Sequence, residues 1–502
     1  MPTSTVVKQA VLVVMLLAQE APAAWLSDRA VDAYNVRVGT QTFAGLYQFT
    51  TNTLLIETAQ VISNMGSSVI KFYLGKEAER QSRVSLGPNI TNLITLVRDE
   101  PSYHRVLDMP FQHFVMWAYP FGNSWPFDGY SARERADDYR ELYDLTCYLL
   151  TNYNNSGKTF YLGHWEGDWY LLPNYNTSTN PSPVAIRGMI DWLNNRQKAV
   201  DDAKLATTHS GVEVFNYAEV NRVLDAMSGN TNINQRAINM VVPYVTKLDC
   251  ISYSSYDVMD ANATTLKSAL DYMQTMLPTN KASVVQGGRL WIGEYAWGSL
   301  DNIIQEQNSR AYLQRLLSWN PGPRFILFWE VYNNETNRAF WLIDSNNIKV
   351  ASYFLHQRFI NKARMLTAQF KERTERLPND TEFGPLVTPM LSQPLPPPVH
   401  LTVSNLAANS TGPGVVSVSG ALAQGVYGDD GAAIGVFYGR RDGGTNRGSW
   451  EHHQFIAVNT NFNPRTYTAR LTNLASGTNY FLRFYATNSS GEVWAPNSSK
   501  IQ

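Results

Sequence analysis

Cysteine is scarce in this chain of 502 residues, which contains only Cys147 and Cys250. Two cysteines exclude a disulfide-stapled scaffold and a zinc site built from thiolates. Cys147 falls within a helical pattern and Cys250 begins a predicted strand, so we expect two separate buried thiols. The eight histidines show no HExxH spacing, and no G-x-S-x-G motif occurs. We therefore predict neither a catalytic metal nor another cofactor, and we disfavour an esterase.

An excess of either charge is also missing, since the formal net charge is -1. This balance gives no electrostatic basis for binding nucleic acid or an anionic membrane. No segment reaches the roughly 18 continuous apolar residues of a membrane-spanning helix. The first segment has Lys8, an apolar run from Ala10 to Ala18, and small residues at positions 21–24. This pattern is typical of a secretory signal peptide, so we expect residues 1–24 to be removed and the protein to be secreted or periplasmic.

Aromatic side chains are plentiful, with 13 Trp and 27 Tyr. Core packing accounts for most side chains of this kind in folded proteins, but exposed aromatic rings also provide stacking surfaces for sugars. The aromatic residues therefore make a carbohydrate the partner to consider first.

Short apolar runs alternate with amphipathic helical patterns from about residue 37. Eight strands, each followed by a helix, predict an α/β fold, a (β/α)8 TIM barrel over residues 25–375. An open doubly wound sheet fits the alternation too, but no Gly-rich phosphate loop follows the first run. The predicted strands are 42–49, 68–74, 113–119, 159–162, 212–216, 250–256, 290–294 and 325–330, and the predicted helices 54–65, 92–98, 133–151, 183–205, 234–245, 264–276, 309–319 and 353–370.

Aromatic and acidic residues gather where the predicted strands end. Two stretches share this composition, Lys158–Trp169 (KTFYLGHWEGDW) and Leu290–Gly298 (LWIGEYAWG). Buried acids cost free energy unless they bind or transfer something, although acids at a strand end also cap helices. Function in a TIM barrel lies at the carboxyl ends of the strands. The residues expected there are Trp117, Trp165, Glu166, Asp168, Trp169, Tyr256, Glu294, Trp297 and Trp329.

With Glu166 after the fourth strand and Glu294 on the seventh, the chain resembles the clan of retaining (β/α)8 glycoside hydrolases. The resemblance implies that Glu166 is the general acid/base and Glu294 the nucleophile in cleaving β-glycosidic bonds of a poly- or oligosaccharide. It also implies that Tyr256, with Tyr253 as the second choice, hydrogen-bonds the nucleophile, and that Trp329 forms the floor of a sugar subsite.

One position departs from that clan. An Asn that binds the sugar 2-hydroxyl precedes the acid/base in much of it, whereas Trp165 precedes Glu166 here. Asn216 and His164 are the candidates to replace that contact.

The remaining acids leave alternatives open. Asp168 is expected to bind sugar hydroxyls, but as an acid partner it would make the enzyme inverting. Glu219 is expected to be a loop or helix-capping acid, and Glu330 a structural ion-pair partner. From a different class of function, a carbohydrate-binding barrel without catalysis also fits, with Trp165, Trp169, Trp297 and Trp329 stacking on the ligand. A Glu166–Glu294 pair buried in salt bridges would favour that non-catalytic function.

The chain changes class after the barrel. Residues 376–398 include the run Pro394–Pro398 and predict a stiff extended linker. Residues 399–502 alternate short strands with Gly and Asn turns, which predicts a small all-β sandwich. The segment Leu471–Asn488 resembles the E–F corner and F strand of a fibronectin type III domain, an immunoglobulin-like fold, with Tyr480 as its tyrosine-corner residue.

Overall fold

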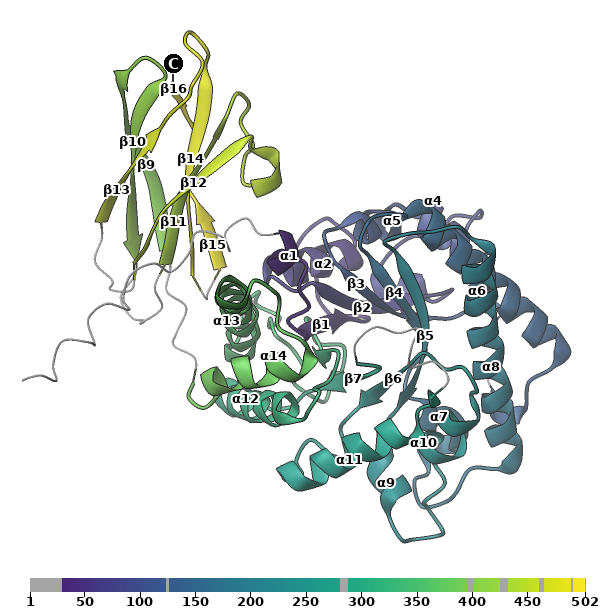
Figure 1. Ribbon diagram of the computed structural model, residues 1–502. Coiled ribbons are helices and arrows are strands. Elements are labelled where there is room, and N and C mark those ends of the chain that lie inside the picture. Colours follow the sequence, from purple (N-terminus) through teal and green to yellow (C-terminus); the bar gives the residue numbers. More distant parts are fainter. Residues whose placement is uncertain are drawn as a thin grey trace, which may run out of the picture. The chain divides into compact units, whose positions relative to one another are not determined.

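The computed structural model describes residues 29–122, 126–279, 288–394, 401–424, 432–459, 465–488 and 491–501 (Figure 1). Its contacts divide the chain into two compact units. One comprises Ala33–Arg364 and Pro378–Leu395, and the other Met1–Asp32, Met365–Leu377 and Pro396–Gln502. The predicted signal peptide, residues 1–24, lies outside the described residues, so secretion stays a prediction. Within the described segments, no helix is long and apolar enough to cross a membrane.

Eight parallel strands close into a barrel in chain order, with β8 paired to β1. The predicted TIM barrel is therefore confirmed. Almost every strand residue is buried, because side chains fill the barrel interior and helices cover its outer face (Figure 1). The strands are β1 Val38–Thr42, β2 Val69–Leu74, β3 His113–Ala118, β4 Thr159–Gly163, β5 Glu213–Val220, β6 Cys250–Ser254, β7 Leu290–Tyr295 and β8 Ile326–Phe328.

Several helices of the barrel begin at side chains that cap free backbone N–H groups. Asn92 and Ser131 form capping boxes at the starts of α4 and α6, and Ser182 caps α8 just before Pro183. These local signals explain why the sequence pattern located the long helices. The α-helices up to residue 374 are α1 Arg29–Asp32, α2 Leu54–Asn64, α3 Ala78–Ser82, α4 Leu93–Asp99, α5 Pro101–Asp108, α6 Ala132–Asn152, α7 Gly167–Leu171, α8 Pro183–Ala206, α9 Val223–Met227, α10 Ala237–Met240, α11 Ala263–Met276, α12 Asn302–Ser318 and α13 Ala351–Thr374.

Two predicted strands differ from the observed ones by four residues or more at an end, and both differences bear on the site. The predicted first strand, 42–49, is a loop beyond Thr42, because Phe43 N turns away and donates to the Glu330 carboxyl at 2.8 Å. The predicted fifth strand ends at Asn216, whereas β5 continues to Val220 and pairs with β6 through its last four residues. The longer β5 brings Glu219 into the barrel wall.

Residues 376–398, predicted as an extended linker, begin with helical structure. Helix α14 spans Asp380–Val387, a 3-10 turn spans Thr388–Leu391, and both pack against α12. Phe383, Val387 and Leu391 are fully buried and recur every four residues, which makes an apolar helical stripe. Burial of this stripe draws the segment onto the barrel unit despite its prolines. Residues 395–400 lie outside the described segments.

The C-terminal strands form two antiparallel sheets, which confirms the predicted all-β region. Val418, Leu471 and Phe484 are buried in their common core. The Tyr480 hydroxyl accepts a hydrogen bond from Ala475 N at 3.2 Å, the contact expected at a tyrosine corner. The fibronectin type III assignment itself stays a prediction. One sheet contains β9 Leu401–Gly412, β10 Val415–Gln424 and β13 Arg465–Leu471; the other contains β11 Ala432–Gly439, β12 His452–Asn459, β14 Tyr480–Asn488, β15 Gly491–Trp494 and β16 Ser499–Ile501.

Candidate functional site

Two adjoining cavities lie at the carboxyl ends of the barrel strands, and they share Trp165 and Trp329. The first, here named the carboxyl cavity, has a volume of about 340 Å³ and the second, the aromatic cavity, about 360 Å³. The carboxyl cavity is lined by Trp165, Glu166, Trp169, Asn221, Arg222, Tyr256, Asp257, Glu294, Trp329, Glu335, Arg338 and Phe340. The aromatic cavity is lined by Phe43, Ala44, Tyr73, Glu77, Arg80, Gln81, Trp117, Tyr119, Trp165, Tyr170, Trp329 and Asn334.

Glu166 lies between the end of β4 and the start of α7, and its side chain is 7% exposed. Its Oε2 accepts a hydrogen bond from Trp169 Nε1 at 2.5 Å, and its backbone N donates to Glu219 Oε1 at 3.3 Å. Burial and the charge of Glu219 raise the pKa of the Glu166 carboxyl to about 8. Glu166 therefore holds a proton at neutral pH while facing a cavity.

Glu294 reaches the same cavity from β7 and is held at both carboxyl oxygens. Lys71 Nζ lies 3.3 Å from its Oε1, and the Tyr256 hydroxyl donates to its Oε2 at 3.4 Å. Burial raises the pKa of Glu294 well above its ordinary value, and the charge of Lys71 opposes this rise. Tyr256 thus lies where the resemblance implied, whereas Tyr253 donates to Asp257 instead.

A third carboxylate lies beneath this pair, and sequence reasoning assigned it wrongly. Glu219 is neither in a loop nor a helix cap: it is a fully buried β5 residue whose Oε2 lies 2.9 Å from Lys71 Nζ. The Ser252 hydroxyl donates to the same oxygen at 2.8 Å. Lys71 also donates to Gly293 O at 3.2 Å, so one buried cation joins β2, β5 and β7. The only signal for Lys71 was a charged residue within an otherwise apolar strand.

Three of the four predicted stacking tryptophans line the cavities. Trp165 and Trp329 line both, and Trp169 lines the carboxyl cavity. Trp297 lines neither. It packs edge-on against Tyr295 and Tyr312, and its Nε1 donates to Asp260 at 2.7 Å. The prediction that Trp297 stacks on a ligand therefore has no support in this geometry.

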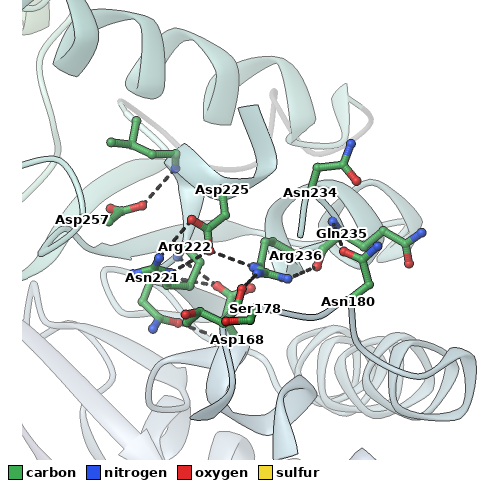
Figure 2. Close-up of polar contacts among 12 residues, drawn as sticks. Asp168, Ser178, Asn180, Asn221, Arg222, Asp225, Asn234, Gln235, Arg236 and Asp257 are labelled. Atoms are coloured by element: carbon green, nitrogen blue, oxygen red, sulfur yellow. Dashed lines mark hydrogen bonds and ion pairs between the residues drawn. The ribbon is translucent and has the colours of Figure 1, made fainter. Parts of the chain in front are cut away.

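Asp168, predicted to bind sugar hydroxyls or to act as an acid, is not among the residues that line the two cavities. Its side chain is fully buried and accepts hydrogen bonds from Asn221 N at 3.0 Å, Arg222 N at 3.1 Å and Ala237 N at 2.7 Å. Figure 2 shows it in a network with Arg222 and Asp225, in which Arg236 also pairs with Asp225. Asp168 therefore joins α7 to the segment after β5 and to the start of α10.

Asn216 and His164 are also buried away from the cavities. Asn216 Nδ2 points to Gln197 Oε1 on α8 at 3.4 Å, which is outside the barrel. His164 Nδ1 lies 2.7 Å from Trp165 O, and its Nε2 accepts from Glu219 N at 3.4 Å. Burial lowers the pKa of His164 to about 3, so the ring is neutral and joins the ends of β4 and β5. Neither residue replaces the Asn missing before Glu166.

Glu330 contacts the backbone of Phe43, and the described residues contain no ion pair for it, contrary to the prediction. The described residues contain no group of three or more His, Cys, Asp or Glu side chains that could hold a metal ion. Cys147 and Cys250 are free thiols.

Comparisons with known proteins return no matching family model and no matching curated protein. Solved glycoside hydrolases do align with the fold. A calcium-binding mutant of Bacteroides uniformis β-glucuronidase 2 aligns over 93% of this chain and 45% of its own, at 11% identity and a TM-score of 0.40. This chain thus spans less than half of that protein.

Two further structures cover most of their own length. A glycoside hydrolase 5 lichenase from Caldicellulosiruptor sp. F32, in complex with cellotetraose, aligns over 71% of this chain and 98% of its own, at 12% identity and a TM-score of 0.41. A Caulobacter crescentus GH39 β-xylosidase aligns over 82% and 91%, at 9% identity and a TM-score of 0.36. Likeness at this level carries no information on catalysis.

Proposed function

We propose that this chain is a retaining β-glycoside hydrolase, with Glu166 as the general acid/base and Glu294 as the nucleophile. One observation carries the proposal: two buried carboxyls from β4 and β7 line a single cavity together with tryptophan rings. Retaining hydrolysis requires two such carboxyls, one protonated and one ionised.

Lys71 distinguishes the surroundings of the two carboxyls. Its ammonium group is the largest effect lowering the pKa of Glu294 and the smallest of the named effects on the pKa of Glu166. Burial raises the pKa of both carboxyls, and that of Glu294 well above its ordinary value. The proposed mechanism requires the proton of the pair on Glu166 and the charge on Glu294, beside the Lys71 ammonium group.

The reaction then proceeds in two steps. A Glu294 carboxylate oxygen bonds to the anomeric carbon as the glycosidic bond breaks, and the leaving oxygen takes the proton of Glu166. Water then attacks the anomeric carbon and gives its proton to Glu166, while the bond to Glu294 breaks. Both glutamates return to their starting protonation states, and the anomeric configuration is retained.

A non-catalytic sugar-binding barrel is the second candidate, and one observation favours it. The side chain of Glu294 is 3% exposed and that of Lys71 is 0% exposed, so the carboxylate lies in a buried ion pair. Asp168 offers no second acid for an inverting mechanism, because it is fully buried, lines neither cavity and accepts hydrogen bonds from three backbone N–H groups.

Turnover of aryl β-glycosides separates these functions. We expect Glu294→Gln to abolish hydrolysis, because an amide cannot form the glycosyl bond. Glu166→Ala should slow poor leaving groups by roughly 10²–10⁴-fold and activated ones much less, since only poor leaving groups need protonation. Proton NMR of the first product should show the retained anomer.

Two results contradict the proposal. Near-wild-type hydrolysis by a folded Glu294→Gln protein would show that Glu294 is not the nucleophile. Equal losses of rate on poor and activated leaving groups in Glu166→Ala would show that Glu166 is not the acid. Sugar binding without hydrolysis of any substrate favours the non-catalytic barrel.

We also propose export through residues 1–24, which the absence of that segment from the mature secreted chain would test.

A further inference from the structure

The proposed chemistry occupies only the carboxyl cavity and leaves the aromatic cavity without a role. Aromatic rings form the boundary between the two cavities. The Trp117 ring centroid lies 3.9 Å from that of Phe43, 5.9 Å from that of Trp329 and 6.4 Å from that of Trp165. The volume of about 360 Å³ falls within the roughly 300–1,000 Å³ typical of ligand pockets.

Three residues that line the aromatic cavity carry buried polar atoms with no hydrogen-bond partner among the described residues. They are Trp117 Nε1, Gln81 Oε1 and Asn334 Oδ1. Trp117 is only 6% exposed, so its N–H donor is buried. Most buried polar atoms in native proteins are paired, because an unpaired one costs free energy. One donor and two acceptors around an aromatic wall match the hydroxyl groups and apolar C–H face of a sugar ring.

The charges of this cavity cancel. Glu77 and Arg80 are the only carboxylate and the only basic side chain among its described lining residues, and Arg80 Nη2 lies 2.5 Å from Glu77 Oε2. A carboxylated or sulfated sugar would find no unpaired cation there. A flat aromatic ligand would stack on the walls but leave all three polar atoms unpaired. The chemistry therefore favours a neutral sugar.

We propose that the aromatic cavity binds a second, neutral sugar ring of the ligand that occupies the carboxyl cavity. The ring stacks at Trp165 and Trp329, receives a hydrogen bond from Trp117 Nε1 and donates hydroxyl hydrogens to Gln81 and Asn334. The location of the cleaved bond rests on the proposed function, whereas the binding of two rings does not. The ligand of the two cavities is consequently a neutral saccharide of at least two rings, and its β-linkage rests on the proposed function.

Binding is measured on the full-length chain carrying Glu294→Gln, so that hydrolysis does not consume the ligand. Calorimetry uses soluble tetrasaccharides of β-linked glucose, xylose, mannose and galactose, with β-linked oligomannuronate as the charged counterpart. Trp117→Phe keeps an aromatic ring and removes the N–H, and Asn334→Ala removes an acceptor on the loop after β8. We expect each to weaken the best neutral ligand about tenfold, the loss of one ligand hydrogen bond. Trp297→Phe, outside both cavities, is the matched control and should not change the affinity.

Full affinity in both Trp117→Phe and Asn334→Ala overturns the inference. So does tighter binding of oligomannuronate than of every neutral tetrasaccharide, or no binding of any neutral tetrasaccharide. Hydrolysis by the unmodified chain is scored separately. Binding that depends on Trp117 but is not accompanied by hydrolysis supports the inference and contradicts the proposed function. Hydrolysis by the unmodified chain, with full ligand affinity in both variants, supports the proposed function and contradicts the inference.

Discussion

The carboxyl of Glu166 should make the stability of the barrel fall as the pH rises. Its pKa is raised from an ordinary value of 4.5 to about 8 in the folded chain, and returns to the ordinary value on unfolding. Between these values the folded state holds a proton that the unfolded state has released. The free energy of unfolding then decreases by up to about 1.4 kcal/mol per pH unit. Between the two pKa values, the total decrease in the free energy of unfolding is at most roughly 5 kcal/mol.

Glu166→Gln removes this titration, because the amide binds no proton in either state. The variant should match the wild type near pH 5 and become more stable by up to about 3 kcal/mol near pH 7. Urea unfolding followed by tryptophan fluorescence measures both proteins across this range. Glu372→Gln, an exposed change on α13, is the isosteric control and should follow the wild type. Parallel pH dependences for Glu166→Gln and wild type would refute the raised pKa and with it the basis for Glu166 as the acid.

Three further outcomes follow from the contacts. Glu219→Gln removes a charge that raises the pKa of both Glu166 and Glu294, so both limbs of the kcat/KM pH profile should move to lower pH. Limbs that stay in place would show that the charge of Glu219 does not affect the two carboxyls. A chain ending at residue 394 should fold and hydrolyse small substrates. A chain ending at residue 377 loses the three buried side chains of α14 and the 3-10 turn, and its free energy of unfolding should fall by roughly 5 kcal/mol or more. Equal melting temperatures of the two chains would show that residues 378–394 are dispensable for stability. Trp297→Ala should lower the free energy of unfolding by about 2 kcal/mol, less than the deletion of a fully buried aromatic side chain, and leave ligand affinity unchanged. A loss of affinity measured by calorimetry would show that Trp297 contacts the ligand.

Local patterns in the sequence were sufficient to predict the architecture. Seven of the eight predicted apolar runs coincide with strands of the barrel, and the long helices α6 and α8 begin at the capping residues Ser131 and Ser182. The count of eight alternations then requires closure, which brings all carboxyl ends to one side. For this reason Glu166, Glu294, Tyr256 and Trp329 were predicted at the cavity without knowledge of any contact.

The direction of each side chain was decided by the tertiary structure. A strand buried on both faces shows no alternation of apolar and polar residues, so its register and its last residue cannot be read from the pattern. Asn216 and Glu219 lie three residues apart on β5, and an odd separation sends them to opposite faces. The same absence of pattern hid Lys71, whose partners come from β5 and β7.

The order of apolar and amphipathic segments was therefore enough to predict the barrel, its strand order and the end at which acids and aromatic rings gather. Which acids line the cavity and which bind backbone groups depends on contacts between distant segments. Asp168 follows Glu166 by two residues, yet it accepts three backbone N–H groups while Glu166 faces the cavity. Those N–H groups come from residues 221, 222 and 237, and long-range hydrogen bonds of this kind leave no local signal in the chain.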